Sequence, residues 1–189
     1  MLFLIVFLCA LFVASALGLM AAWSDFRGMI IPNAYPLGII VAFVFAYTAC
    51  ALGGAPGPLP FQRLSSHLIA GGVALAVTFA MTMAKTMGGG DSKLITAYAL
   101  WMGVLDIAWY LFIVTLIGAV LAIAGLAVRR FKPFTNARPG GWIARLQSGE
   151  AVVAYGIPIA LGALYMFWTE GYAAPDLLKS FIMPDDAAE

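Results

Sequence analysis

Charged residues are scarce in this sequence of 189 residues: Lys, Arg, Asp and Glu make up 10% of it, against about 25% in an ordinary soluble domain. No basic cluster is interleaved with aromatic side chains, which argues against a nucleic-acid partner. Cysteine is also rare: Cys9 and Cys50 both lie in apolar runs, and no Cys-x-x-Cys pair exists. His67 is the only histidine. We therefore expect no metal site, no disulfide framework and no cofactor.

Apolar residues are correspondingly abundant and make up 63% of the chain. A bilayer core of about 30 Å requires about 20 apolar helical residues. Uncharged runs that meet or approach this length occupy residues 1–23, 31–62, 64–84, 107–128 and 151–169, and Pro158 predicts a kink in the last of them. Glycine and proline cluster at 53–60 and should end the second helix. We predict an all-α, polytopic membrane protein embedded in a lipid bilayer.

A sixth crossing depends on residues 94–105, which would extend only about 18 Å as a helix. The run becomes long enough if residues 86–93 also lie at membrane depth. Short loops rich in Lys and Arg stay cytoplasmic, and six crossings with the N-terminus outside satisfy this rule. Eight basic residues are then inside (Arg27, Lys85, Lys93, Arg129, Arg130, Lys132, Arg138 and Arg145) and two outside (Arg63 and Lys179). We predict six transmembrane helices in residues 1–169 and an extracytoplasmic tail at 170–189.

This topology puts two carboxylates on the cytoplasmic side, Asp25 in "WSDFRGMIIPN" and Asp91 in "GGGDSK". An acid at membrane depth costs about 2.5–3.5 kcal/mol on insertion scales, which makes such residues functional candidates. Taken singly, Asp25 could pair with Arg27, and Asp91 could pair with Lys93 or cap a helix. Two carboxylates at one site, however, can divide the roles of acid and base in peptide hydrolysis.

The glycines before Asp91 have a physical role in that hypothesis. Gly88, Gly89 and Gly90 would leave room for a substrate backbone and permit turn conformations that side chains block. Irregular backbone at membrane depth is tolerated where protein or a water-filled cavity surrounds it. We therefore expect a water-accessible cleft at the cytoplasmic end.

The segment from Gly88 to Asp91, followed by Ser92 and Lys93, resembles the Gly-x-Gly-Asp motif of the type IV prepilin peptidases, a family of intramembrane aspartyl proteases. About 60 residues upstream, Asp25, Arg27 and the run Ile31-Pro32-Asn33 resemble the family's other aspartate segment, and "YGIPIALG" at 155–162 is similar to its last helix. The resemblance covers roughly residues 5–168.

The resemblance implies catalysis by Asp25 and Asp91. It implies supporting or substrate-binding roles for Gly88, Gly89, Gly90, Lys93, Arg27 and Asn33. The gap between the first two spans is too short for the methyltransferase domain of the large family members, so the chain looks like the small peptidases of Flp (tight-adherence) pili. Such enzymes cut prepilin and pseudopilin precursors at the cytoplasmic face of the bacterial inner membrane, with both termini periplasmic here. Pilus assembly machinery is a further candidate partner.

Other interpretations stay open at the level of sequence. An archaeal preflagellin peptidase is similar in plan. A noncatalytic membrane subunit of a pilus or secretion assembly would tolerate loss of either acid. A small proton-coupled transporter would use Asp25 or Asp91 as proton carrier, although the chain shows no internal repeat of the kind common in transporters.

Overall fold

A computed structural model describes residues 2–53 and 61–172 of the chain. These residues form helices and connecting segments without a strand, which confirms the predicted all-α class. The helices are α1 (Leu2–Gly28), α2 (Ala34–Gly53), α3 (Leu64–Met83), α4 (Gly89–Phe131), α5 (Trp142–Gln147) and α6 (Gly156–Thr169). Helices α1 to α4 are long and apolar enough to cross a membrane, and α6 is a shorter apolar helix.

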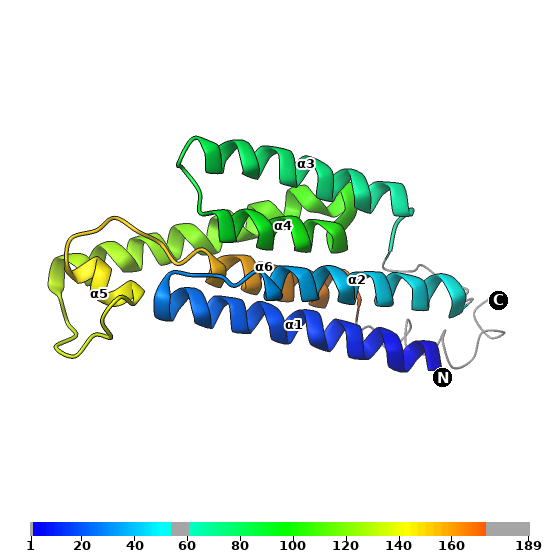
Figure 1. Cartoon of the computed structure of the whole chain (residues 1–189), viewed down its shortest axis with the longest axis horizontal. Helices are drawn as coiled ribbons and strands as arrows, with labels where there is room; N and C mark the ends of the chain where they lie inside the picture. Colours follow the sequence, from blue (N-terminus) through cyan, green and yellow to red (C-terminus); the bar gives the residue numbers. More distant parts are fainter. Residues whose placement is uncertain (1, 54–60, 173–189) are drawn as a thin grey trace.

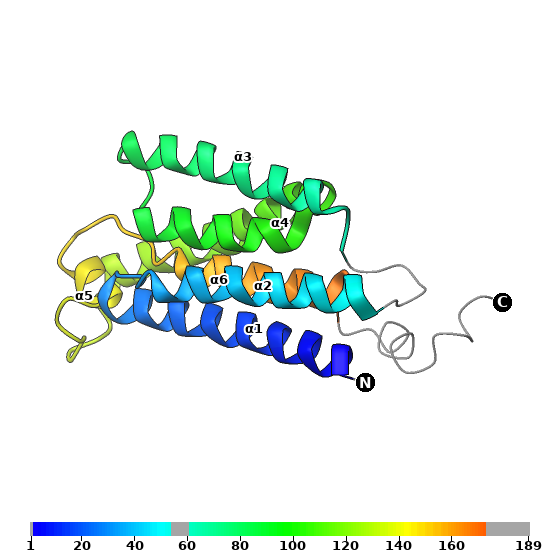
Figure 2. The ribbon, with the colours of Figure 1, turned by 45° about the vertical axis from the view of Figure 1, so that its right-hand side comes forward.

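The long helices lie side by side along the longest dimension of the molecule (Figure 1). α1 packs on α2, α3 packs on α4, and α6 contacts both α1 and α4. Figure 2 shows the same order from a second direction, with α3 on one side of the bundle and α1 on the other. Helices that are apolar around most of their circumference suit this arrangement, because faces not buried against a neighbour can contact lipid.

α4 bends sharply at Gly103, where the backbone leaves the helical region with φ 69° and ψ −177°. A positive φ of this kind favours glycine, which has no Cβ to clash. The chain reverses there, so residues 89–102 and 104–131 form two helical arms (Figure 1). Gln62 Nε2 donates a hydrogen bond to Asp106 Oδ2 at 2.9 Å beside the bend. The two arms correspond to the predicted fourth and fifth spans.

The first helix differs from the predicted span at its C-terminal end. α1 continues to Gly28, so Asp25 and Arg27 belong to the helix rather than to a loop after it. Between the predicted end at Trp23 and Gly28 there is no glycine or proline to end the helix. The chain turns only at Met29, which takes a left-handed conformation with φ 54°.

The last helix is shorter than predicted, because α6 begins at Gly156 and residues 151–155 lie outside it. Pro158 supplies the reason. A proline inside a helix removes a backbone hydrogen bond and clashes with the carbonyl four residues earlier, which here belongs to Ala154. In the first turn that bond does not exist and proline is tolerated. Pro158 therefore marks the start of α6 instead of kinking it.

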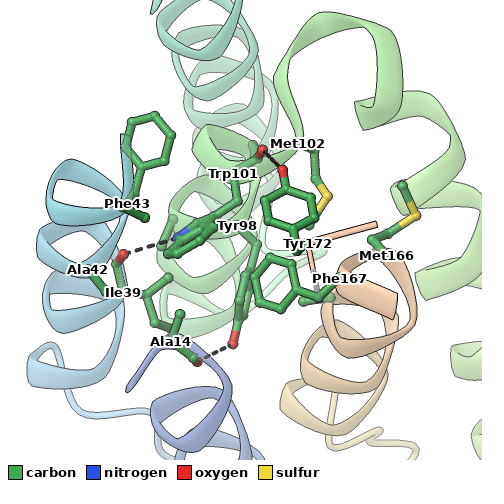
Figure 3. Close-up of a cluster of buried hydrophobic side chains, with 14 of the residues drawn as sticks. Ala14, Ile39, Ala42, Phe43, Tyr98, Trp101, Met102, Met166, Phe167 and Tyr172 are labelled. Atoms are coloured by element: carbon green, nitrogen blue, oxygen red, sulfur yellow. Dashed lines mark hydrogen bonds between the residues drawn. The ribbon is translucent and has the colours of Figure 1, made fainter. Parts of the chain in front are cut away.

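Aromatic side chains fill the centre of the bundle, where α1, α2, α4 and α6 meet (Figure 3). Tyr98 Oη donates a hydrogen bond to the carbonyl of Ala14 in α1 at 2.9 Å. Trp101 Nε1 donates to the carbonyl of Ile39 in α2 at 3.2 Å. Each bond contributes roughly 1 kcal/mol net. Together they hold the first arm of α4 against α1 and α2, and so fix where Asp91 lies relative to α1.

The predicted tail and the glycine–proline cluster fall mostly outside the described residues, which omit 54–60 and 173–189. α2 does end at Gly53, the first residue of that cluster. Tyr172, near the start of the predicted tail, is packed in the core, and its Oη donates a hydrogen bond to the carbonyl of Trp101 at 2.6 Å (Figure 3).

One end of the bundle gathers the positive charge. The C-terminal end of α1, the segment from the end of α3 into the first turns of α4, and the segment from the end of α4 through α5 all lie there (Figures 1 and 2). These segments carry the eight basic residues predicted to be inside. Arg63 lies at the opposite end, where α3 begins. We call the first of these the basic end, defined by residues 25–33, 84–93 and 129–150.

Candidate active site

Asp25 lies in the last turns of α1, with 5% of its surface exposed. Its Oδ2 accepts a hydrogen bond from the backbone N–H of Gly156 at 2.8 Å. Gly156 is the first residue of α6, so the carboxylate occupies a helix N-terminus, where N–H groups lack intrahelical partners and the helix dipole favours negative charge. α6 thus holds an acid that is 131 residues distant in sequence.

The contact between α6 and Asp25 requires a residue without a side chain. A Cβ added to Gly156 would lie 2.9 Å from the Cβ of Asp25 and 3.1 Å from its Oδ2. Residues 155–162 resemble the family's last helix, but nothing in that sequence predicts a role for Gly156. No local pattern marks the contact, because it depends on how α1 and α6 pack.

Asp91 lies in the first turn of α4 and is half-buried. Its neighbour Ser92 fixes that turn: the Ser92 N–H donates to the carbonyl of Gly88 at 3.1 Å, and its hydroxyl pairs with Thr78 Oγ1 of α3 at 2.8 Å. Both hydroxyls are buried. The pair therefore ties the start of α4 to α3, a role for Thr78 that the sequence did not reveal.

The three glycines before Asp91 have ordinary backbone conformations, which corrects the expectation that they supply turns closed to other residues. The described glycines with positive φ are Gly103, Gly140, Gly149 and Gly171. At two of the three, an added Cβ would instead lie closer than 3.0 Å to a neighbouring atom. A Cβ at Gly88 would lie 2.8 Å from Asp91 Oδ2, and one at Gly90 would lie 2.9 Å from the Cβ of Ile31. At Gly89 the nearest atom would be at an ordinary 3.8 Å.

Asp25 and Asp91 line one cavity of about 240 Å³ at the basic end. The other lining residues are Met29, Ile30, Ile31, Gly88, Gly89 and Gly90. Residues from the end of α1 and from the start of α4 thus border the same space. Since a water occupies about 30 Å³ in the liquid, the cavity can hold several. Two carboxylates in the wall of a cavity that has room for water are suited to acid–base hydrolysis.

A hydrogen bond joins the two motif segments beside this cavity. Lys93 Nζ donates to Asn33 Oδ1 at 2.9 Å, and both side chains are exposed. Neither residue lines the aspartate cavity. Together with the contact between Gly90 and Ile31, this bond holds the start of α4 against the segment that follows α1.

Arg27 lies apart from the two aspartates. Its guanidinium carbon is 4.5 Å from the centre of the Trp23 ring, a cation–π contact. Arg27 lines a different cavity at the basic end, together with Trp23 and Trp142. Of the six residues predicted to support catalysis, the three glycines line the aspartate cavity, and Lys93 and Asn33 lie beside it.

His67 is buried at a distance from the basic end. Its Nδ1 lies 2.6 Å from the carbonyl oxygen of Leu100, and its ring packs against Phe43 and Phe61. Within residues 2–53 and 61–172, no group of three or more His, Cys, Asp or Glu side chains is arranged to hold a metal ion.

The sequence is similar to proteins of a known family. Residues 2–123 match the type IV leader peptidase family, a region that includes α1 to α3, most of α4 and both aspartates. The chain is similar to a prepilin leader peptidase/N-methyltransferase of Bacillus subtilis (strain 168), with 32% identity over 149 residues, 76% of this chain and 57% of that protein. The chain thus spans little more than half the length of this relative. No solved structure matches it.

Proposed function

Because the chain belongs to the type IV leader peptidase family, we propose that it is an intramembrane aspartyl endopeptidase that removes the leader peptide from prepilins and pseudopilins. The observation that carries this proposal is the shared cavity of Asp25 and Asp91. The relative's printed name supports the substrate class, and the two carboxylates support the aspartyl mechanism.

In the proposed reaction the two acids exchange protons with one water and the scissile peptide bond. Asp25, whose negative charge is stabilised by the Gly156 N–H and the α6 terminus, takes a proton from water as the water oxygen attacks the carbonyl carbon. Asp91 donates its proton to the carbonyl oxygen. When the tetrahedral intermediate collapses, Asp25 protonates the leaving nitrogen and Asp91 recovers a hydroxyl proton. The C–N bond breaks and both acids return to their starting states.

We also propose that the basic end faces the cytoplasm from a bacterial inner membrane, with both termini periplasmic. The support is electrostatic, since short loops rich in Lys and Arg remain on the cytoplasmic side. The aspartate cavity would then meet a prepilin at the cytoplasmic end of its hydrophobic segment.

The substrate class within the family is proposed to be the Flp type. The segment between α1 and α2 consists of residues 29–33, which leaves no room there for an inserted domain. Methyl transfer, which the name of the Bacillus relative includes, is not part of the proposal for this chain.

Co-expression of the full chain with a Flp-type prepilin tests the proposal. We expect the prepilin to shift to the mature size, and Asp25→Asn and Asp91→Asn each to abolish the shift while the protein remains in the membrane. Asp106→Asn is the matched control, because it makes the same change at a carboxylate beside the Gly103 bend. If Asp25→Asn or Asp91→Asn cleaves at the wild-type rate, that acid is not catalytic. If no prepilin is cut by the wild type, a noncatalytic subunit or a transporter becomes the better interpretation.

A further inference from the structure

A second and larger cavity, of about 490 Å³, lies at the basic end between α1, α5 and the segment 133–138. Trp23, Phe26 and Arg27 of α1 line one side, and Arg138 and Trp142 line the other. We call it the arginine–tryptophan cavity. It shares no lining residue with the aspartate cavity, and no Asp or Glu lines it. The proposed hydrolysis leaves it without a role.

Close backbone packing brings the two arginines to this cavity. A Cβ at Gly141 would lie 3.2 Å from the carbonyl oxygen of Arg27 and 3.2 Å from that of Arg138. The Gly141 N–H also donates to the Arg138 carbonyl at 3.1 Å. The segment that carries Arg138 is therefore seated directly on the end of α1.

The positive charge of the cavity has no carboxylate partner among the described residues. The ion pair in that part of the chain joins Arg145 to Glu150 at 2.7 Å. Arg27 and Arg138 are both exposed. A guanidinium offers several N–H donors in a planar fork that matches phosphate oxygens. Two guanidinium groups without a carboxylate partner at one cavity therefore favour a phosphate-bearing ligand.

An exposed apolar stripe on α1 leads to the cavity. Phe12, Met20 and Trp23 are 73%, 51% and 56% exposed, and with Arg27 they are separated by eight, three and four residues, which places them on one face of a helix. Aromatic rings such as Trp23 favour the headgroup level of a bilayer. A ligand that suits both features has a phosphate next to long hydrocarbon chains.

We propose that the arginine–tryptophan cavity binds the headgroup phosphate of an anionic glycerophospholipid, whose acyl chains lie along the α1 stripe. A free phosphate ester shares the headgroup chemistry, but the stripe would contribute nothing to its binding. The site is separate from the aspartate cavity, so the proposal does not depend on peptidase activity.

Native mass spectrometry of the full chain, released from detergent containing equal amounts of phosphatidylglycerol and phosphatidylcholine, tests this site. The double variant Arg27→Gln/Arg138→Gln removes both cavity cations. Arg129→Gln/Arg130→Gln is the matched control, because it removes equal charge from the same end of the bundle without touching the cavity lining. Circular dichroism establishes that each variant keeps its helices.

We expect the wild type and the control to retain phosphatidylglycerol in preference to phosphatidylcholine, and the cavity variant to retain at least about tenfold less of it, as loss of charge-assisted hydrogen bonds implies. The variant Arg27→Lys/Arg138→Lys keeps the charge but loses the planar guanidinium donors. Its retention of phosphatidylglycerol should lie between that of the wild type and that of the glutamine cavity variant. Equal retention by both glutamine variants would overturn the proposal in favour of general charge attraction. Full displacement of the lipid by glycerol phosphate, or binding of an acidic prepilin peptide without phosphatidylglycerol, would also overturn it.

Discussion

Alanine at Gly90 should damage the candidate active site, whereas alanine at its neighbour Gly89 should not. A Cβ at Gly90 would lie 2.9 Å from the Cβ of Ile31, and one at Gly89 would meet its nearest atom, Thr82 Cγ2, only at 3.8 Å. The Ile31 Cβ is attached to the backbone, so no rotamer change removes it. Residue 31 also precedes Pro32, which restricts its backbone. The start of α4 must therefore move instead.

The size of the effect follows from that movement. Ordinary contact begins at 3.4 Å, so α4 must retreat from Ile31 by at least about 0.5 Å. Overpacking of this kind costs about 1–3 kcal/mol, partly offset by the better helix propensity of alanine, about 1 kcal/mol. Stability should therefore fall by no more than about 2 kcal/mol. Because Asp91 is the next residue, its carboxylate shifts relative to Asp25, and displacements approaching 1 Å cost about 100-fold in rate.

Purified Gly90→Ala and Gly89→Ala proteins should be compared in detergent for prepilin cleavage and for thermal unfolding. We expect Gly90→Ala to cleave about 10- to 100-fold more slowly than wild type, and Gly89→Ala to remain within about twofold with an equal or higher unfolding temperature. Wild-type cleavage by Gly90→Ala would refute the packing argument. Equal damage from both variants would show that the glycine run acts through flexibility instead.

Two further predictions concern contacts that support the site, and a third concerns the orientation of the protein in the membrane. Gly156→Ala should slow prepilin cleavage by at least about tenfold, because its Cβ would press on Asp25 at 2.9 Å; a wild-type rate in the same assay would show that α6 does not position the acid. A double-mutant cycle of Lys93→Met and Asn33→Ala on unfolding should give a coupling of about 0.5–1.5 kcal/mol for their 2.9 Å hydrogen bond, and additive effects would contradict the contact. A topology reporter fused at residue 136 should read as cytoplasmic, and a periplasmic signal there would reverse the proposed orientation.

Helix positions were predictable where composition changes abruptly. α3 occupies Leu64–Met83, one residue shorter than the predicted run, because charged residues stand at both of its ends. The extent of α6 could have been inferred as well, since Pro158 is compatible with a first turn and not with a helix beginning at residue 151. The bend in α4 was harder to place, because the predicted runs 94–105 and 107–128 put the turn at residue 106, whereas Gly103 supplies the positive φ.

The contacts that build the site were not predictable from local rules. The motif segments identified Asp25 and Asp91, and six crossings placed them at one end of the molecule. The hydrogen bond from Gly156 and the pairing of Ser92 with Thr78 depend on which helix faces meet. The sequence of a uniformly apolar helix gives little indication of which of its faces contacts a neighbouring helix. For the same reason, the sequence grouped Arg27 with the aspartates, whereas the structure places it at a separate cavity.

The hydrogen bond between Asp25 and Gly156 also sets an order of events during biosynthesis. Asp25 is translated 131 residues before its partner, which at about 5–20 residues per second is a delay of roughly 7 to 26 seconds. During that interval Asp25 has been synthesised, but the N-terminus of α6 that stabilises its charge has not. A nascent chain stalled before α6 would carry both aspartates without the amide that holds the first of them, so competence to cut should be acquired only when the last described helix enters the bilayer.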